Sequence, residues 1–139
     1  MKLTADTNIL VRVAVQDDPE QAAIATALLR DAESIAVTLP VLCEFVWVLA
    51  RLYKRQAADI ADAIRRLIGS ATVLVDRPAT EAGLAMLEAG GDFADGVIAF
   101  EGRRLGALIF VSFDARAVAL VRAGGDEALL LRENYPAPG

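Results

Sequence analysis

The sequence of 139 residues contains no histidine and only one cysteine, Cys43. The absence of histidine excludes Ser-His-Asp and Cys-His catalysis, H-E-x-x-H zinc sites and ribonucleases whose acid–base groups are histidines. A single cysteine excludes an internal disulfide and disfavours a soft-metal site, so a reducing cytoplasm is the expected location. The chemistry left to an enzyme of this composition uses oxygen ligands, Lys and Arg. Carboxylates that hold a hard cation are its natural candidates.

Long hydrophobic runs are also missing. The longest weakly charged stretch, residues 35–50, is interrupted by Pro40 and Glu44 and is shorter than the roughly 20 residues of a membrane span. The N-terminal M-K-L-T-A-D-T reaches an acid too early for a secretory signal, so we expect no membrane association. The net charge of −5 argues against a protein that coats nucleic acid, although an acidic cation site would explain part of that charge beside local arginine clusters.

Strand and helix signals alternate along the chain, without a repeat or a linker that would divide it. Strands are expected at residues 3–5, 34–38, 72–75, 107–112 and 128–131. Helices are expected at residues 9–15, 19–30, 40–53, 57–68, 80–88, 92–105 and 115–122, with Thr80 as one N-cap. Several of the strands are apolar on both faces. The pattern predicts a single α/β domain over residues 1–139, a three-layer α/β/α sandwich with a mainly parallel central sheet.

Acidic side chains mark one edge of this expected sheet. Asp6 follows the first strand and Asp114 follows the strand at 107–112, and ligands of such sheets bind beyond the carboxyl ends of the strands. Asp95, in D-F-A-D-G-V-I-A, lies in the first turn of a helix that another helix precedes, so its position at this edge does not follow from the pattern alone. Each acid also has a structural interpretation, as a helix cap or as a partner of a helix dipole.

Glu44 is the only charge in V-L-C-E-F-V-W-V-L. Its neighbours three and four residues away are all non-polar: Pro40, Val41, Trp47 and Val48. We therefore expect Glu44 to lie outside any solvent-exposed stripe and to share its face with one charge, Arg51. An unpaired carboxylate among apolar residues is costly, so Glu44 is expected either to meet a cation or to pair with a buried Arg. Trp47 and Cys43 are expected in the core.

Four segments in order, D-T-N-I-L, V-L-C-E-F-V-W-V-L, D-F-A-D-G-V-I-A and V-S-F-D-A-R-A, resemble the PIN-domain ribonucleases, and among them the VapC-like toxins of type II toxin–antitoxin modules. The resemblance covers nearly the whole chain and implies a PIN-like fold. It implies a catalytic cluster that binds Mg²⁺ or Mn²⁺, formed by Asp6, Glu44, Asp95 and Asp114. In the family, the metal-bound acids activate water that cleaves RNA to leave a 5′ phosphate and a 3′ hydroxyl. The implied partners are an RNA substrate, a small cognate antitoxin and a second copy of the chain.

Other polar residues are weaker candidates. The candidate supporting residues near the acids are Thr7, Asn8, Asp92 and Ser112, for which turn, strand or N-cap roles are the alternatives. The candidate cations for a cleft rim that holds RNA phosphates are Arg51, Lys54, Arg103 and Arg116, beside Arg55 and Arg104. For each of these cations, a solvated surface position is the alternative.

Two other phosphate-handling classes fit the sequence poorly. A receiver-like domain needs a Lys after a late strand, and no Lys follows Lys54. A haloacid-dehalogenase-like phosphatase needs D-x-D after the first strand, where this chain has D-T-N. Within the PIN-like class, a stand-alone RNA-processing nuclease and an inactive binding module remain alternatives to a toxin.

Overall fold

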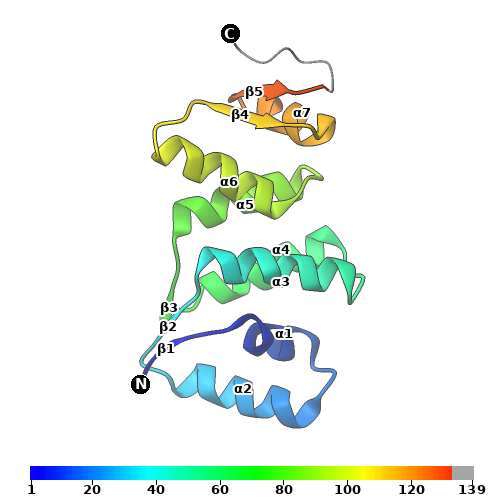
Figure 1. Ribbon diagram of the computed structural model, residues 1–139. Helices are drawn as coiled ribbons and strands as arrows, with labels where there is room; N and C mark the ends of the chain where they lie inside the picture. Colours follow the sequence, from blue (N-terminus) through cyan, green and yellow to red (C-terminus); the bar gives the residue numbers. More distant parts are fainter. Residues whose placement is uncertain (133–139) are drawn as a thin grey trace. The chain divides into compact units, whose positions relative to one another are not determined.

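The computed structural model describes residues 1–132 (Figure 1). The chain forms two compact units, Met1–Thr80 and Glu81–Gly139, and the boundary falls inside helix α5 (Arg77–Glu88). The expected α/β class and parallel pairing are confirmed, because every described strand pair is parallel. The strands form two sheets, one in each unit. No helix within residues 1–132 is long and apolar enough to cross a membrane.

The first unit holds a three-stranded sheet in the order β1-β2-β3. Its strands are short: β1 (Lys2–Thr4), β2 (Ser34–Ala36) and β3 (Val73–Leu74). Its helices are α1 (Thr7–Val15), α2 (Pro19–Asp31), α3 (Leu39–Arg51) and α4 (Ala57–Ile68), as Figure 1 shows. The core of this unit is apolar and includes the fully buried Ile35, Leu42 and Ile64.

The second unit holds a two-stranded sheet of β4 (Ile109–Ser112) and β5 (Glu127–Leu130), together with α6 (Phe93–Arg104) and α7 (Ala115–Ala123). Helix α6 packs closely on α5 at Gly96. A Cβ atom on Gly96 would lie 2.5 Å from the carbonyl oxygen of Ala82 and 2.8 Å from the Cβ atom of Met86. The two helices therefore approach along a line where only glycine fits, directly beside Asp95.

Helix starts follow the strands at a constant spacing. The residue two positions beyond each of β1, β2, β3 and β4 precedes a helix: Asp6, Thr38, Asp76 and Asp114. Three of these four residues are aspartates whose side chains accept a hydrogen bond from the first turn of the helix. The predicted positions of Asp6 and Asp114, directly after parallel strands, are therefore confirmed. Both are N-caps as well as candidate ligands.

The helix that follows β3 begins earlier than predicted. Thr80 is not its cap: Thr80 is fully buried within α5, and its hydroxyl donates to the carbonyl oxygen of Asp76 at 2.7 Å. The carboxylate of Asp76 accepts from the backbone N–H of Ala79 at 3.2 Å and takes the capping role. Pro78 is compatible with this earlier start because the first turn of a helix needs no backbone N–H there.

Helix α3 buries a different face from the one predicted. Its buried residues are Leu42, Phe45, Val46 and Leu49. At about 3.6 residues per turn, Glu44, Trp47 and Arg51 lie on the opposite side of the helix, and all three are exposed. The predictions that Glu44 avoids a solvent-exposed face and that Trp47 is a core residue are therefore wrong. Cys43, at the border between the two faces, is half-buried.

A polar cluster fixes the C-terminal end of α3. Arg12 of α1 donates to Gln21 Oε1 at 2.7 Å and to Asp17 Oδ1 at 3.1 Å. The hydroxyl of Tyr53, which follows α3, donates to Asp17 Oδ2 at 2.9 Å. These bonds hold the α1–α2 turn against the segment that begins the α3–α4 connection. Lys54, the next residue, has a left-handed backbone with φ of 54°.

Candidate metal centre

Asp6 is the N-cap of α1 and is exposed. Its Oδ1 atom accepts a hydrogen bond from the backbone N–H of Thr7 at 2.8 Å. No protein donor to its Oδ2 atom is recorded within residues 1–132. The helix thus orients the carboxylate through one oxygen and leaves the other for a ligand.

Thr7 carries a polar atom that the fold leaves without a partner. Its side chain is 4% exposed, and its Oγ1 atom has no hydrogen-bond partner in the part of the chain that the structure describes. A buried hydroxyl without a partner costs about 1–3 kcal/mol, so such a group usually marks a place for a water or ligand. The orphaned hydroxyl beside Asp6 therefore fits a hydrated cation there. Asn8, the next residue of α1, is exposed.

Asp114 occupies the equivalent position after β4. Its Oδ1 atom accepts from the backbone N–H groups of Arg116 and Ala117 at 2.9 and 3.2 Å. The backbone N–H of Asp114 donates to Ser112 Oγ at 3.0 Å, so the serine fixes the turn that presents the aspartate. Ser112 thereby supports Asp114 through the backbone.

Asp95 has the most perturbed carboxylate among the four predicted ligands. It is half-buried in the first turn of α6, and no hydrogen bond to its side chain is recorded within residues 1–132. Burial raises the pKa of Asp95, and the nearby charges of Asp92 and Asp114 raise it further. A half-buried carboxylate with like charges beside it and no donor is an arrangement that a bound cation would relieve.

Asp92 supplies one of these charges. Its carboxylate accepts from the backbone N–H of Ala94 at 3.1 Å, which makes it the N-cap of α6. The N-cap role that the sequence analysis gave as the alternative for Asp92 is thus observed. The electrostatic influence of Asp92 on Asp95 remains, and it adds to the negative potential around the site.

The four predicted ligands are divided between the two units, with Asp6 and Glu44 in the first and Asp95 and Asp114 in the second. The charges of Asp92 and Asp114 reach Asp95, but within residues 1–132 no three acidic or cysteine side chains lie close enough to hold one metal ion. The shared four-acid metal site therefore stays a prediction. All four side chains supply oxygen donors, the ligand type that Mg²⁺ and Mn²⁺ take in proteins.

The candidate rim cations differ in their surroundings. Arg51 and Lys54 are exposed at the end of α3. Arg103 forms an ion pair with Asp126 and lies 5.8 Å from the centre of the Phe100 ring, so the packing of its own unit already accounts for it. The Arg116 guanidinium lies against the backbone turn at residue 90. A role for each of them in RNA binding stays a prediction.

Asp76 was missed by the sequence analysis. It follows β3 at the same spacing as Asp6 follows β1, and its carboxylate caps α5. The signal was present in T-V-L-V-D, an apolar strand that ends in an acid.

The first unit also contains an apolar groove of about 640 Å³. Its walls come from α1, α3 and α4, with Leu10, Phe45, Leu49 and Ile60 among the lining residues. Exposed side chains of Arg55, Asp59 and Arg66 border it. The groove therefore combines an apolar floor with charged edges.

Comparison with known families identifies the chain. Residues 4–123 match the PIN domain family. The match covers most of the chain and crosses the boundary between the two units, so this protein belongs to the PIN domain family, and the predicted PIN-like α/β fold class is confirmed. No curated protein matches the sequence.

Among solved structures, the chain is similar to VapC20 of Mycobacterium tuberculosis, a toxin that cleaves the sarcin-ricin loop. The two share 18% sequence identity and align with a TM-score of 0.43, over 90% of this chain and 96% of that one. The family assignment rests on the PIN domain match alone.

Proposed function

We propose that this protein is a metal-dependent endoribonuclease, a single PIN domain that acts as the toxin of a toxin–antitoxin module in the cytoplasm. The observation that carries the proposal is Asp95, a half-buried carboxylate whose pKa is raised by burial and by two neighbouring acids and for which residues 1–132 supply no recorded hydrogen-bond donor. Membership of the PIN domain family and the lack of histidine support hydrolysis through acidic residues and a cation.

The residues that would hold the ion are Asp6, Glu44, Asp95 and Asp114. A bound Mg²⁺ or Mn²⁺ lowers the pKa of water, polarises the phosphate and offsets charge on the leaving oxygen. The first-turn amides of α1 and α7 hold Oδ1 of Asp6 and of Asp114, which fixes the direction of each free oxygen. Asp95 would supply a charge for which no competing donor is recorded among the described residues. Attack of water on phosphorus with departure of the 3′ oxygen leaves a 5′ phosphate and a 3′ hydroxyl.

Removal of the divalent ion tests this mechanism. We expect purified protein to cleave structured RNA in Mg²⁺ or Mn²⁺, to lose cleavage in EDTA and to regain it when the metal is restored. Asp6→Asn is expected to lose at least about 100-fold in kcat/KM, since removing even an outer-shell partner of a metal ligand costs roughly 10- to 100-fold. Asparagine caps helices as well as aspartate does, so the variant should keep its fold.

The control for that experiment is Asp18→Asn, the N-cap of α2, whose side chain accepts from the backbone N–H of Gln21 at 3.1 Å. It makes the same chemical change at a cap that does not follow a strand, and its activity is expected to stay near that of the wild type. Cleavage that persists in EDTA, or an Asp6→Asn variant as active as Asp18→Asn, would contradict the metal mechanism.

The groove of the first unit supports the toxin role. Its apolar lining between α1, α3 and α4 could receive an apolar segment of a small antitoxin, and Arg55 and Arg66 would attract acidic residues beside that segment. Exposed apolar residues elsewhere in the unit, such as Ile24 and Leu74, leave surface for a homodimer. Both partners are part of the proposal.

Expression in a bacterial host tests this role. We expect the wild type to arrest growth, the Asp6→Asn variant to be tolerated, and the product of a short reading frame directly upstream to restore growth. A wild-type enzyme that cleaves RNA in vitro but neither slows growth nor has such a neighbour would instead be a stand-alone PIN nuclease. A protein that binds RNA without cleaving it would be an inactive binding module.

A further inference from the structure

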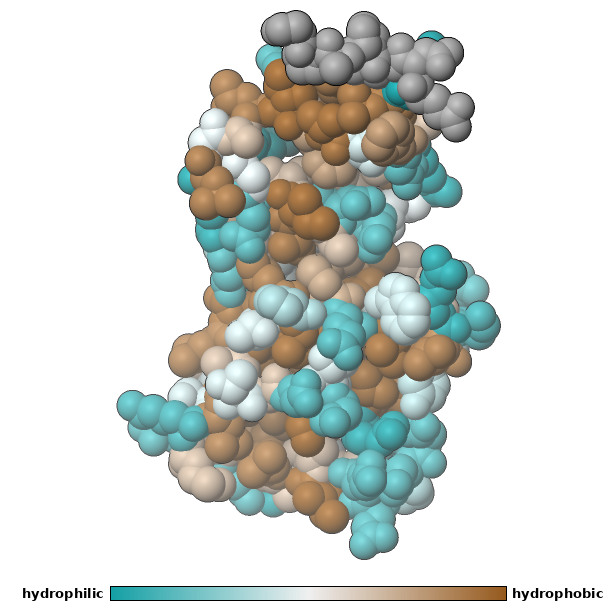
Figure 2. All heavy atoms as spheres, viewed as in Figure 1, coloured by the Kyte–Doolittle hydropathy of each residue, from teal (hydrophilic) through white to brown (hydrophobic). Residues whose placement is uncertain are grey.

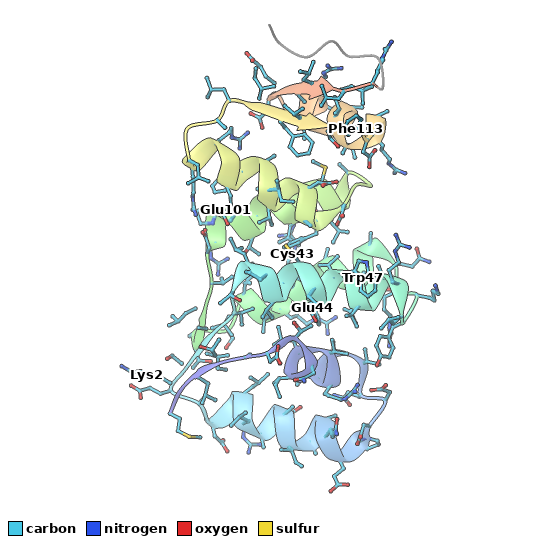
Figure 3. The ribbon with its side chains drawn as sticks, in the orientation of Figure 1. Lys2, Cys43, Glu44, Trp47, Glu101 and Phe113 are labelled. Atoms are coloured by element: carbon cyan, nitrogen blue, oxygen red, sulfur yellow. The ribbon has the colours of Figure 1, made fainter. Side chains whose placement is uncertain are left out.

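Trp47 is an exposed aromatic residue on a helix that also carries a predicted metal ligand. Its side chain is 55% exposed, although α3 has an extensive buried face on its other side. Glu44 precedes it by three residues on the same exposed side, and Figure 3 labels both side chains on this helix. Side chains three residues apart on a helix are neighbours, so the indole lies one turn from the Glu44 carboxylate.

The neighbours of Trp47 along α3 are small or charged. The residues three and four positions away along α3 are Cys43, Glu44, Ala50 and Arg51. Arg51 lies one turn beyond Trp47, and Lys54 and Arg55 follow the end of the helix; all three are exposed. The exposed side of α3 therefore runs from an acid through an aromatic ring to a group of cations. The space-filling view in Figure 2 likewise shows hydrophilic and hydrophobic residues mixed on the visible surface of this part of the chain.

This composition favours nucleic acid over a protein partner. Docking surfaces for proteins join several large apolar side chains, and here the ring stands among a carboxylate, small residues and cations. Surfaces that bind single-stranded nucleic acid combine aromatic rings, on which bases stack, with cations that follow the phosphates. A base inside a duplex is already stacked on both faces, whereas an unpaired base has a face to offer the ring.

We propose that Trp47 stacks on an unpaired RNA base next to the bond that is cleaved, while Arg51 and Lys54 hold the phosphates that follow. The preferred substrate is then a loop or another single-stranded segment. This inference rests on the proposed ribonuclease function and adds to it a substrate class and a substrate-binding residue. Glu44, one turn away from the ring, is the predicted metal ligand on the same helix.

The chain provides its own probe, because Trp47 is its only tryptophan. The titration uses the Asp95→Asn variant in Mg²⁺, to prevent cleavage, with a hairpin RNA that has an unpaired loop and a blunt duplex of the same stem sequence. We expect the hairpin to quench tryptophan fluorescence as it binds. The duplex should bind more weakly and leave the fluorescence nearly unchanged.

Substitutions separate stacking from general affinity. Trp47→Ala is expected to weaken hairpin binding by roughly 5- to 100-fold, the range of base–aromatic stacking measured by alanine substitution, and Trp47→Phe should retain most of the affinity. The matched control is Leu52→Ala, an apolar residue that is 66% exposed at the end of the same helix but on another side. Its affinity is expected to stay within about twofold of the parent, as for surface substitutions that touch no partner.

The outcomes distinguish this inference from the proposed function. A wild type that cleaves the hairpin, together with a Trp47→Ala variant of unchanged affinity and kcat/KM, would overturn stacking and leave the nuclease intact. If Trp47→Ala instead changes the mass of the protein in solution, measured by light scattering, without changing hairpin binding, Trp47 belongs to a protein interface and the inference is wrong. A wild type that neither binds nor cleaves RNA would overturn both the stacking role of Trp47 and the proposed ribonuclease function.

Discussion

Asp95→Asn is expected to reduce RNA cleavage by more than about 100-fold, because it removes a proposed direct ligand of the metal, whereas loss of an outer-shell partner alone costs roughly 10- to 100-fold. The substitution keeps the shape of the side chain. No hydrogen bond to the Asp95 carboxylate is recorded within residues 1–132, so the change breaks no protein contact described by the structure. The expected loss is therefore chemical, and should appear in kcat/KM with an unchanged circular dichroism spectrum.

Asp92→Asn is the matched control for this experiment. It lies one helical turn before Asp95 and carries the same charge, but its carboxylate caps α6, and asparagine can accept the same hydrogen bond from Ala94. We expect its activity to remain within several-fold of the wild type, consistent with a local charge effect. If Asp92→Asn is as damaging as Asp95→Asn, Asp92 is a ligand as well. If neither variant loses activity, the acidic site is wrong.

Asp95→Asn is also expected to change the free energy of unfolding, by an amount that depends on pH. The folded state raises the pKa of Asp95. Below the ordinary pKa of an aspartate the side chain is protonated in both the folded and the unfolded states, so it does not reduce stability. As pH rises from that value through the folded pKa, the charged side chain is disfavoured in the folded state and stability is lost. Asparagine carries no ionisable group, so the Asp95→Asn variant does not lose stability in this way. Without metal, the unfolding free energy of the variant relative to the wild type should therefore increase as pH rises above about 4, the ordinary pKa of an aspartate. Added Mg²⁺ should stabilise the wild type more than the variant.

Gly96→Ala is expected to destabilise the second unit by about 1–3 kcal/mol or more, the usual cost of overpacking. The new methyl group would lie 2.5 Å from the carbonyl oxygen of Ala82 and 2.8 Å from the Cβ atom of Met86. The first contact is with backbone, so a change of side-chain rotamer cannot relieve it. Helix α6 would have to move away from α5 and carry Asp95 with it, so activity should fall together with stability.

Gly102→Ala, in the same helix, is a control that is expected to change stability in the opposite direction. Apart from its chain neighbours and the backbone of its own helix, no atom of the described residues lies within 4 Å of a Cβ atom built there, and alanine favours a helix over glycine by about 1 kcal/mol. Urea denaturation should therefore show Gly102→Ala to be more stable than the wild type and Gly96→Ala to be less stable. Equal effects of both substitutions would mean that α5 and α6 do not pack closely at Gly96.

The sequence predicted the order of strands and helices well, because the signals that it used are local. The apolar segment before Asp6 and the apolar segment before Asp114 both end at an aspartate, a residue type that favours turns and helix N-caps. Such caps depend on the side chain and on the next few backbone amides, so their positions followed from neighbouring residues.

The exposed side of α3 could not be predicted in the same way. Glu44 and Arg51 mark one side of this helix, but the apolar residues around Glu44 made a carboxylate in an enclosed pocket equally compatible with the sequence. Packing with the rest of the unit selects the face of Leu42 and Phe45, which turns Glu44 and Trp47 to solvent. The sequence shows which residues α3 contains, but the side of the helix that faces solvent depends on tertiary contacts.

The capping role of Asp6 and Asp114 restricts which cation they suit. Each uses Oδ1 for backbone amides, which leaves Oδ2 as the oxygen that can ligate without breaking a cap. Such a carboxylate binds an ion through one atom and in one direction. Ca²⁺ takes about 6–8 oxygen ligands and often grips both oxygens of a carboxylate, whereas Mg²⁺ accepts single oxygens and keeps several of its waters. If Asp6 and Asp114 ligate the proposed ion, their capping bonds are therefore expected to favour a small, hydrated cation over a larger one.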